Sequence, residues 1–128
     1  MSRSRDALVV EPEADVRTLV CEYLQGMGFH ATGVADASAM RAALHDAAFD
    51  LIVLDATTSE DEEVTLAMEV RKHGIRLVMI SGRPALMELF QDRTDQLLWK
   101  PFRRDDFEHA VRRAFASEVR GQRKEEPN

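Results

Sequence analysis

Four short apolar runs divide this chain, and a polar side chain stands at the end of each run. Runs of Val, Ile and Leu that alternate with longer stretches of helical spacing are typical of parallel strands buried on both faces. The four polar residues are Glu11, Asp55, Ser81 and Lys100. In an open parallel sheet, ligands bind beyond the carboxyl ends of the strands. The sequence therefore predicts that two carboxylates, a hydroxyl and an ammonium group converge on one site.

The size and composition of the chain indicate one globular domain. Its 128 residues are 45% hydrophobic and 31% charged, enough for one core and too few for two. A formal charge of -6 disfavours a nucleic-acid surface, which is usually basic. No run approaches the roughly 20 apolar residues that span a bilayer, and the start of the chain is too polar for a secretory signal. With Cys21 as the single cysteine, we expect a cytoplasmic protein with no nucleic-acid or membrane partner.

Five strands are predicted to alternate with five helices. We expect the strands at 7–10, 29–34, 50–54, 76–80 and 96–99, and the helices after each of them, the third near 61–73, the fourth short and opening at Pro84, and the fifth carrying the apolar stripe from Phe107 to Phe115. Crossovers of this length imply a parallel sheet with helices on both faces, a doubly wound α/β fold. We expect one domain over residues 1–120 and a polar C-terminal tail over 121–128.

At these strand ends the sequence resembles the receiver domain of bacterial two-component response regulators. The residues that carry the resemblance are Ala7–Glu11, Asp50–Asp55, Val78–Gly82 and Lys100–Phe102, in the order and near the spacing of that family. The likeness runs from Ala7 to about Phe115. It implies a flavodoxin-like fold with strand order 2-1-3-4-5, and a module of phosphorelay signalling rather than an enzyme.

The resemblance also implies roles for individual residues. Asp55 matches the aspartate that accepts a phosphoryl group from a histidine kinase or a phosphotransfer protein and forms an aspartyl phosphate. Ser81 and Lys100 match the hydroxyl and the ammonium group that hold phosphoryl oxygens, and the bond from Lys100 to Pro101 is cis in the family. The alternatives are a turn residue before Gly82 for Ser81 and a surface lysine for Lys100.

The metal ligands of the family are matched only in part. Glu11, Asp55 and the backbone carbonyl of Thr57 correspond to positions that bind Mg²⁺ in receivers. Pro12 stands where the family has a second acid that contacts the metal directly. We therefore expect Mg²⁺ binding to be weak or absent. The acids at 60–63 are either auxiliary ligands or, as we favour, part of a capping box of Ser59 with Glu62 at the start of a helix.

The position that signals the state of the site also departs from the family. Receivers commonly carry an aromatic residue three positions before the lysine, and here that switch position holds Leu97. The usual aromatic switch is then absent or replaced. Trp99 is the nearest aromatic residue, and we expect it to pack in the core under the last helix.

Three functions remain open from the sequence. The first is a phosphorylatable receiver that signals through a downstream protein partner or a homodimer. The second, favoured by Pro12 and Leu97, is a pseudo-receiver that acts as a protein-interaction module without phosphorylation. The third is a phosphatase with an aspartate nucleophile, of the haloacid dehalogenase kind. That class needs a second aspartate two residues beyond the first, where this chain has Thr57, so we disfavour it.

Overall fold

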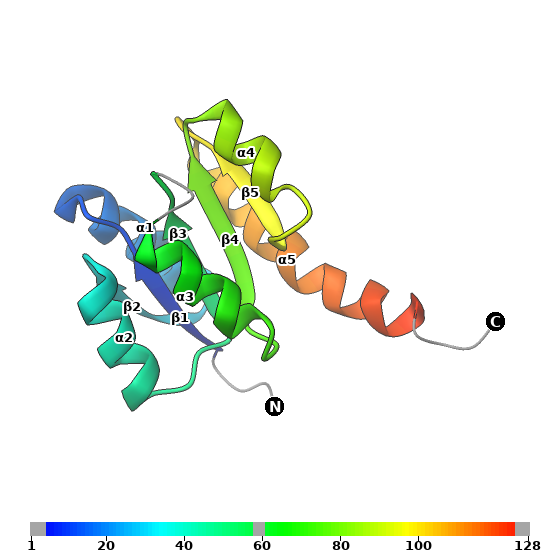
Figure 1. Cartoon of the computed structure of the whole chain (residues 1–128), viewed down its shortest axis with the longest axis horizontal. Coiled ribbons are helices and arrows are strands. Elements are labelled where there is room, and N and C mark those ends of the chain that lie inside the picture. The colour runs from blue at the N-terminus through cyan, green and yellow to red at the C-terminus, as the bar shows by residue number, and fades with distance from the viewer. Residues whose placement is uncertain (1–4, 58–60, 125–128) are drawn as a thin grey trace.

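A five-stranded parallel sheet lies between two layers of helices in the computed structural model, which describes residues 5–57 and 61–124 (Figure 1). The strands are β1 (Arg5–Val10), β2 (Phe29–Val34), β3 (Leu51–Asp55), β4 (Arg76–Ser81) and β5 (Gln96–Trp99). They are ordered β2-β1-β3-β4-β5, and every neighbouring pair is parallel. The predicted doubly wound fold and strand order are therefore confirmed.

Five helices of the described chain connect and follow the strands. They are α1 (Ala14–Gly26), α2 (Ala37–Asp46), α3 (Glu62–Arg71), α4 (Pro84–Phe90) and α5 (Arg104–Lys124). The turns after α1 and α3 pass through Gly28 and Gly74, whose φ angles of 94° and 95° favour glycine because other side chains clash there. The fourth helix is short, as predicted, with seven residues.

The alternation of strand side chains divides the core into two halves. Successive residues of a strand point to opposite faces of its sheet. Ala7, Val9 and Val53 pack with α1 and α5 on one face, whereas Leu8 and Leu54 pack with α2, α3 and α4 on the other. Because β1, β3 and β4 are apolar at consecutive positions, both faces are filled, as the continuous runs predicted.

The start of α3 and the end of α5 bear on two of the sequence predictions. The helix predicted near 61–73 begins at Glu62 with Asp61 at its N-cap position, while Ser59, the other partner of the predicted capping box, lies outside the described residues. Glu62 forms an ion pair with Arg41 of α2. The backbone of α5 continues through Gly121 to Lys124 and extends away from the sheet (Figure 1). The division into a domain and a tail at this point stays a prediction.

Across the part of the chain that the structure describes, none of the helices combines the length and the apolar character needed to cross a lipid bilayer.

Candidate functional site

The carboxyl ends of β1, β3, β4 and β5 bring the four predicted side chains to one edge of the sheet. Asp55 ends β3 and Ser81 ends β4, while Glu11 and Lys100 directly follow β1 and β5. The Lys100 Nζ atom lies 2.6 Å from Asp55 Oδ2 and 3.8 Å from Glu11 Oε1. The backbone N–H of Lys100 donates to the carbonyl of Ser81 over 3.1 Å. Residues separated by 45 positions in the chain thus meet in one cluster.

Glu11 is the most enclosed of the charged residues in this cluster, with 3% of its surface exposed. Burial first, and then a hydrogen bond shared with Asp55, raise the pKa of its carboxyl group from 4.5 to about 7. The backbone N–H of Glu13 donates to Glu11 Oε2 over 3.0 Å, which opposes this increase together with the charge of Lys100.

Lys100 is held as an ammonium ion by its acidic neighbours. Burial acts to lower its pKa, but the hydrogen bond to Asp55 and the charges of Asp55, Glu11 and Glu13 raise the pKa above its ordinary value. The Lys100–Pro101 peptide bond is cis, as the resemblance implied. Lys100 is not a solvated surface lysine, because its amine forms an ion pair with Asp55, whose side chain is 14% exposed.

Ser81 is buried at the end of β4 and takes part in a turn. Its Oγ atom accepts a hydrogen bond from the backbone N–H of Arg83 over 3.1 Å. This contact fits the alternative prediction from the sequence, that Ser81 is a turn residue before Gly82. Because the oxygen only accepts in this bond, the hydroxyl proton can still be donated to another group.

The possible metal ligands are two carboxylates, of Glu11 and Asp55, and the carbonyl of Thr57. Oxygen atoms of this kind are the ligands that Mg²⁺ prefers, so the donor set fits the ion in kind. Pro12 adds no carboxylate, and its exposed carbonyl accepts a hydrogen bond of 3.4 Å from Arg17. Within residues 5–57 and 61–124, no group of three or more His, Cys, Asp or Glu side chains is placed to hold a metal ion.

Arg17 supports the site and was not found from the sequence. Its Nη1 atom donates to the carbonyl of Glu11 over 2.8 Å, so a residue of α1 holds the loop that positions the buried carboxyl group. The arginine stem crosses β2 at Gly33, where an added Cβ would lie 2.9 Å from Arg17 Cγ. The sequence signal is an arginine in α1 and a glycine in β2. That they face each other becomes visible only once the packing of α1 on β2 is known.

Leu97, at the switch position, and Trp99, which we expected to pack in the core, lie in different surroundings. Leu97 is half-buried and packs against the core on the side of α2, α3 and α4. Trp99 is 51% exposed, so the prediction that it packs in the core under α5 is wrong. Leu98 packs on the face of the sheet that α5 covers, so alternation along β5 turns Trp99 to the other face, where Leu97 lies. The replacement of the aromatic switch at Leu97 stays a prediction.

The chain is similar to known proteins over nearly its whole length. A family model described as the response regulator receiver domain matches residues 7–112. The transcriptional regulatory protein RprY of Bacteroides fragilis is 28% identical over 126 residues, with 94% of this chain and 53% of that protein covered. The chain thus spans about half the length of this curated relative.

Solved structures give the same result. The receiver domain of NtrX from Brucella abortus has a TM-score of 0.70 and 30% identity, covering 85% of this chain and 97% of that one. The chemotaxis response regulator CheY4 of Vibrio cholerae has a TM-score of 0.76 over 88% of this chain and 99% of that one. At 20% identity, the second likeness shows the fold alone.

Proposed function

This chain belongs to the family of response regulator receiver domains, and from that premise we propose that Asp55 accepts a phosphoryl group from a histidine kinase or a phosphotransfer protein. The signal then passes to a downstream protein through surface contacts. The observation that carries the proposal is the ion pair between Lys100 Nζ and Asp55 Oδ2, 2.6 Å long, at the edge of the sheet where β4 ends in a buried serine. An acceptor carboxylate, a cation and a hydroxyl are what a transferred phosphoryl group needs around it.

In the proposed transfer, a carboxylate oxygen of Asp55 attacks the phosphorus atom of a phosphohistidine. A phosphorus–oxygen bond forms as the phosphorus–nitrogen bond breaks, and the imidazole nitrogen leaves with that electron pair and takes a proton from water. Lys100 orients the carboxylate before transfer and pairs with a phosphoryl oxygen after it. Ser81 donates its hydroxyl proton to another phosphoryl oxygen.

Glu11, Asp55 and the carbonyl of Thr57 are the groups that would hold Mg²⁺ in this site. When bound, the ion supplies positive charge between the acceptor and the phosphoryl oxygens. Because Pro12 offers no carboxylate, we propose that the affinity for Mg²⁺ is below that of receivers with an acid at this position.

The test is incubation of the whole chain with acetyl phosphate and Mg²⁺, followed by intact mass measurement. We expect a mass increase of one phosphoryl group that is lost in Asp55→Asn. Asp92→Asn is the matched control, because it makes the same chemical change at an exposed residue between α4 and β5. A mass increase that persists in Asp55→Asn would contradict the assignment of the acceptor.

A second candidate function is a pseudo-receiver that binds its partner without phosphorylation. Two observations favour it: Pro12 stands in place of an acid in the site, and the half-buried Leu97 offers no aromatic ring at the switch position. The same experiment separates the two functions. If acetyl phosphate and a cognate phosphotransfer protein both leave the mass unchanged while the fold is intact by circular dichroism, the pseudo-receiver is the correct function.

A further inference from the structure

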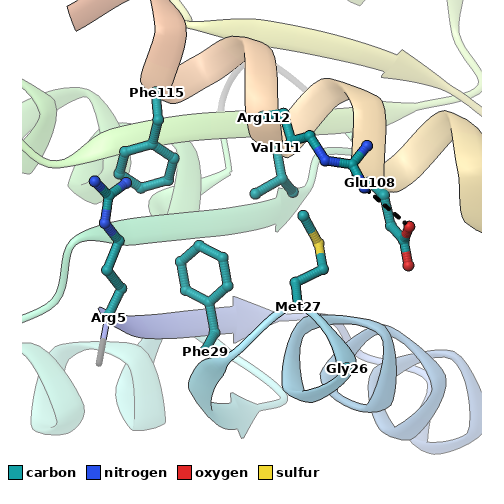
Figure 2. A pocket seen from close by; sticks show the side chains of 8 residues that line it. All are labelled: Arg5, Gly26, Met27, Phe29, Glu108, Val111, Arg112 and Phe115. Carbon is teal, nitrogen blue, oxygen red and sulfur yellow. Dashed lines mark hydrogen bonds and ion pairs between the residues drawn. The ribbon is translucent and has the colours of Figure 1, made fainter. Parts of the chain in front are cut away.

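A cavity of about 450 Å³ opens between α5 and the turn that joins α1 to β2 (Figure 2). It lies at the edge of the sheet where β1 and β2 begin, because Arg5 and Phe29, the first residues of these strands, both line it. Asp55 ends its strand at the opposite edge. The cavity is therefore separate from the candidate phosphorylation site, and an occupant does not compete with the chemistry there.

Four of the residues that line the cavity give it an apolar wall. Met27, in the turn after α1, and Phe29, at the start of β2, point into it, and Val111 and Phe115 face them from α5 (Figure 2). The Phe29 and Phe115 rings are tilted by 41° with their centroids 5.9 Å apart. Val111 belongs to the buried core, and the other three are partly buried against it. These walls rest against the buried core of the domain, as the walls of preformed ligand sites usually do.

The rim of the cavity carries an excess of positive charge. The guanidinium carbon of Arg5 lies 4.1 Å from the centroid of the Phe115 ring, and Arg112 stands on the other side of the cavity (Figure 2). Glu108 is the one acid among the lining residues. Its carboxylate is shared between Arg104, at 2.8 Å, and Arg112, at 3.4 Å.

The positive and negative charges of the residues around the cavity do not cancel. There is one carboxylate, of Glu108, for the three guanidinium groups of Arg5, Arg104 and Arg112, although the formal charge of the whole chain is -6. A stacked guanidinium keeps its N–H donors at its edge, where they can bind an anion in addition to the ring contact. An apolar interior with arginines at its rim selects an apolar body that carries a negative group.

We propose that this cavity binds a small aromatic molecule bearing one anionic group. The aromatic body lies among Phe29, Val111 and Phe115, where flat rings pack well. The anionic group, a carboxylate or a sulfonate, accepts hydrogen bonds from Arg5 or Arg112. The volume falls within the range of roughly 300–1,000 Å³ that is usual for sites of small ligands. Because such a ligand joins α1, β2 and α5, it stabilises the folded chain by mass action.

The probe for a first test is anilinonaphthalene sulfonate, an aromatic anion whose fluorescence rises in apolar surroundings. Its neutral analogue, phenylnaphthylamine, has the same aromatic body without the charge. We expect saturable binding of the anion to the whole chain, an increase in the melting temperature, and much weaker binding of the neutral analogue. Any affinity tag belongs at the C-terminus, because Arg5 is close to the N-terminus.

The variants Arg5→Gln and Arg112→Gln test the role of the rim. We expect each to weaken binding of the anion by about tenfold, the effect of losing one charge-assisted hydrogen bond, with no effect on the neutral analogue. Arg93→Gln is the matched control, because it removes the same charge from an exposed residue between α4 and β5 that does not line the cavity. All three positions are exposed, so these variants keep the fold, which circular dichroism checks.

Methyl chemical shifts locate the bound probe. Shifts concentrated on Met27 and Val111 support the proposal. Any of three results overturns it: no saturable binding of the anion, equal affinity for the neutral analogue, or the same loss of affinity in Arg93→Gln as in the two rim variants. None of these results bears on whether Asp55 is phosphorylated, since the two sites lie at opposite edges of the sheet.

Discussion

At the scale of single residues, the carboxyl group of Glu11 links the candidate site to the stability of the protein. Its burial beside Asp55 raises its pKa to about 7, so near neutral pH the folded protein holds a proton that an exposed glutamate has already released. The backbone N–H of Glu13 and the ammonium group of Lys100 offset part of the cost of ionising it. The ionised Glu11 carboxylate therefore destabilises the folded state at high pH, whereas at low pH the group is neutral and has no such effect.

The pH dependence follows from the direction of this shift. In the unfolded chain Glu11 ionises near its ordinary pKa of 4.5, so between pH 4.5 and about pH 7 the unfolded state binds fewer protons than the folded state. The contribution of Glu11 to stability therefore falls as the pH rises through this window. We expect Glu11→Gln to raise the free energy of unfolding by about 2 kcal/mol at pH 8 and to change it little at pH 4.5.

Urea denaturation at both pH values, without divalent metal ions, checks this prediction. Glu88→Gln, a matched change at an exposed residue of α4, should have no pH-dependent effect. An equal effect of Glu11→Gln at both pH values would show that its carboxyl group does not titrate in this window.

Pro12 provides a second test at the residue scale. Because it stands where receivers have a carboxylate, we expect Pro12→Asp to strengthen Mg²⁺ binding by about tenfold or more, since a third charged oxygen ligand is added. Pro12→Ala is the control that removes the proline ring without adding a ligand. Titration of Mg²⁺ followed by amide shifts measures both, and equal affinities in the two variants would contradict the prediction.

At the scale of secondary-structure elements, Asp95, in the loop before β5, binds to both α3 and β4. Its side chain is 7% exposed, accepts a hydrogen bond of 2.7 Å from the backbone N–H of Leu77 in β4, and pairs with Arg71 of α3 at 3.3 Å. Thr94 donates to the carbonyl of the same leucine over 2.8 Å. The loop before β5 thus holds the start of β4 by side-chain bonds.

We expect Asp95→Ala to lower the free energy of unfolding by about 2–3 kcal/mol, because it leaves the N–H of Leu77 without its carboxylate and Arg71 without its partner. Asp95→Asn keeps an oxygen acceptor and loses only the charge, so we expect a loss of about 1 kcal/mol. Chemical denaturation measures both variants. If the two lost the same stability, the ion pair with Arg71 rather than the bond to Leu77 would be the dominant contact.

At the scale of the whole molecule, the parallel sheet separates two regions of different chemistry. The edge where the strands end gathers Glu11, Asp55, Ser81 and Lys100, while the edge where β1 and β2 begin carries the arginine-rimmed cavity beside Phe29. All strands run in one direction, so residues at strand ends and residues at strand starts are kept apart by the length of the strands. The proposed phosphoryl site and the proposed ligand site therefore lie at separate places in one small domain.

Much of this fold and of the candidate site could be predicted from the sequence. Continuous apolar runs of strand length are buried on both faces of a sheet wherever they occur, so the strands near Leu8 and Ile52 and the polar residues at their ends, Glu11 and Asp55, were determined locally. The strand order came from the family resemblance. The meeting of Asp55 with Lys100 then followed, because parallel strands end at one edge.

Other features were decided only by tertiary structure. The burial of Glu11, the passage of Arg17 over Gly33 and the exposure of Trp99 each depend on which elements cover a residue, and residues far apart in the sequence supply that cover. The cavity at Phe29 is of the same kind, since its walls come from two segments that the chain brings together only after it folds. The sequence by itself determined which side chains stand at strand ends, because side-chain direction in a strand is a local property. The packing of helices on the sheet decided which of them lose contact with water.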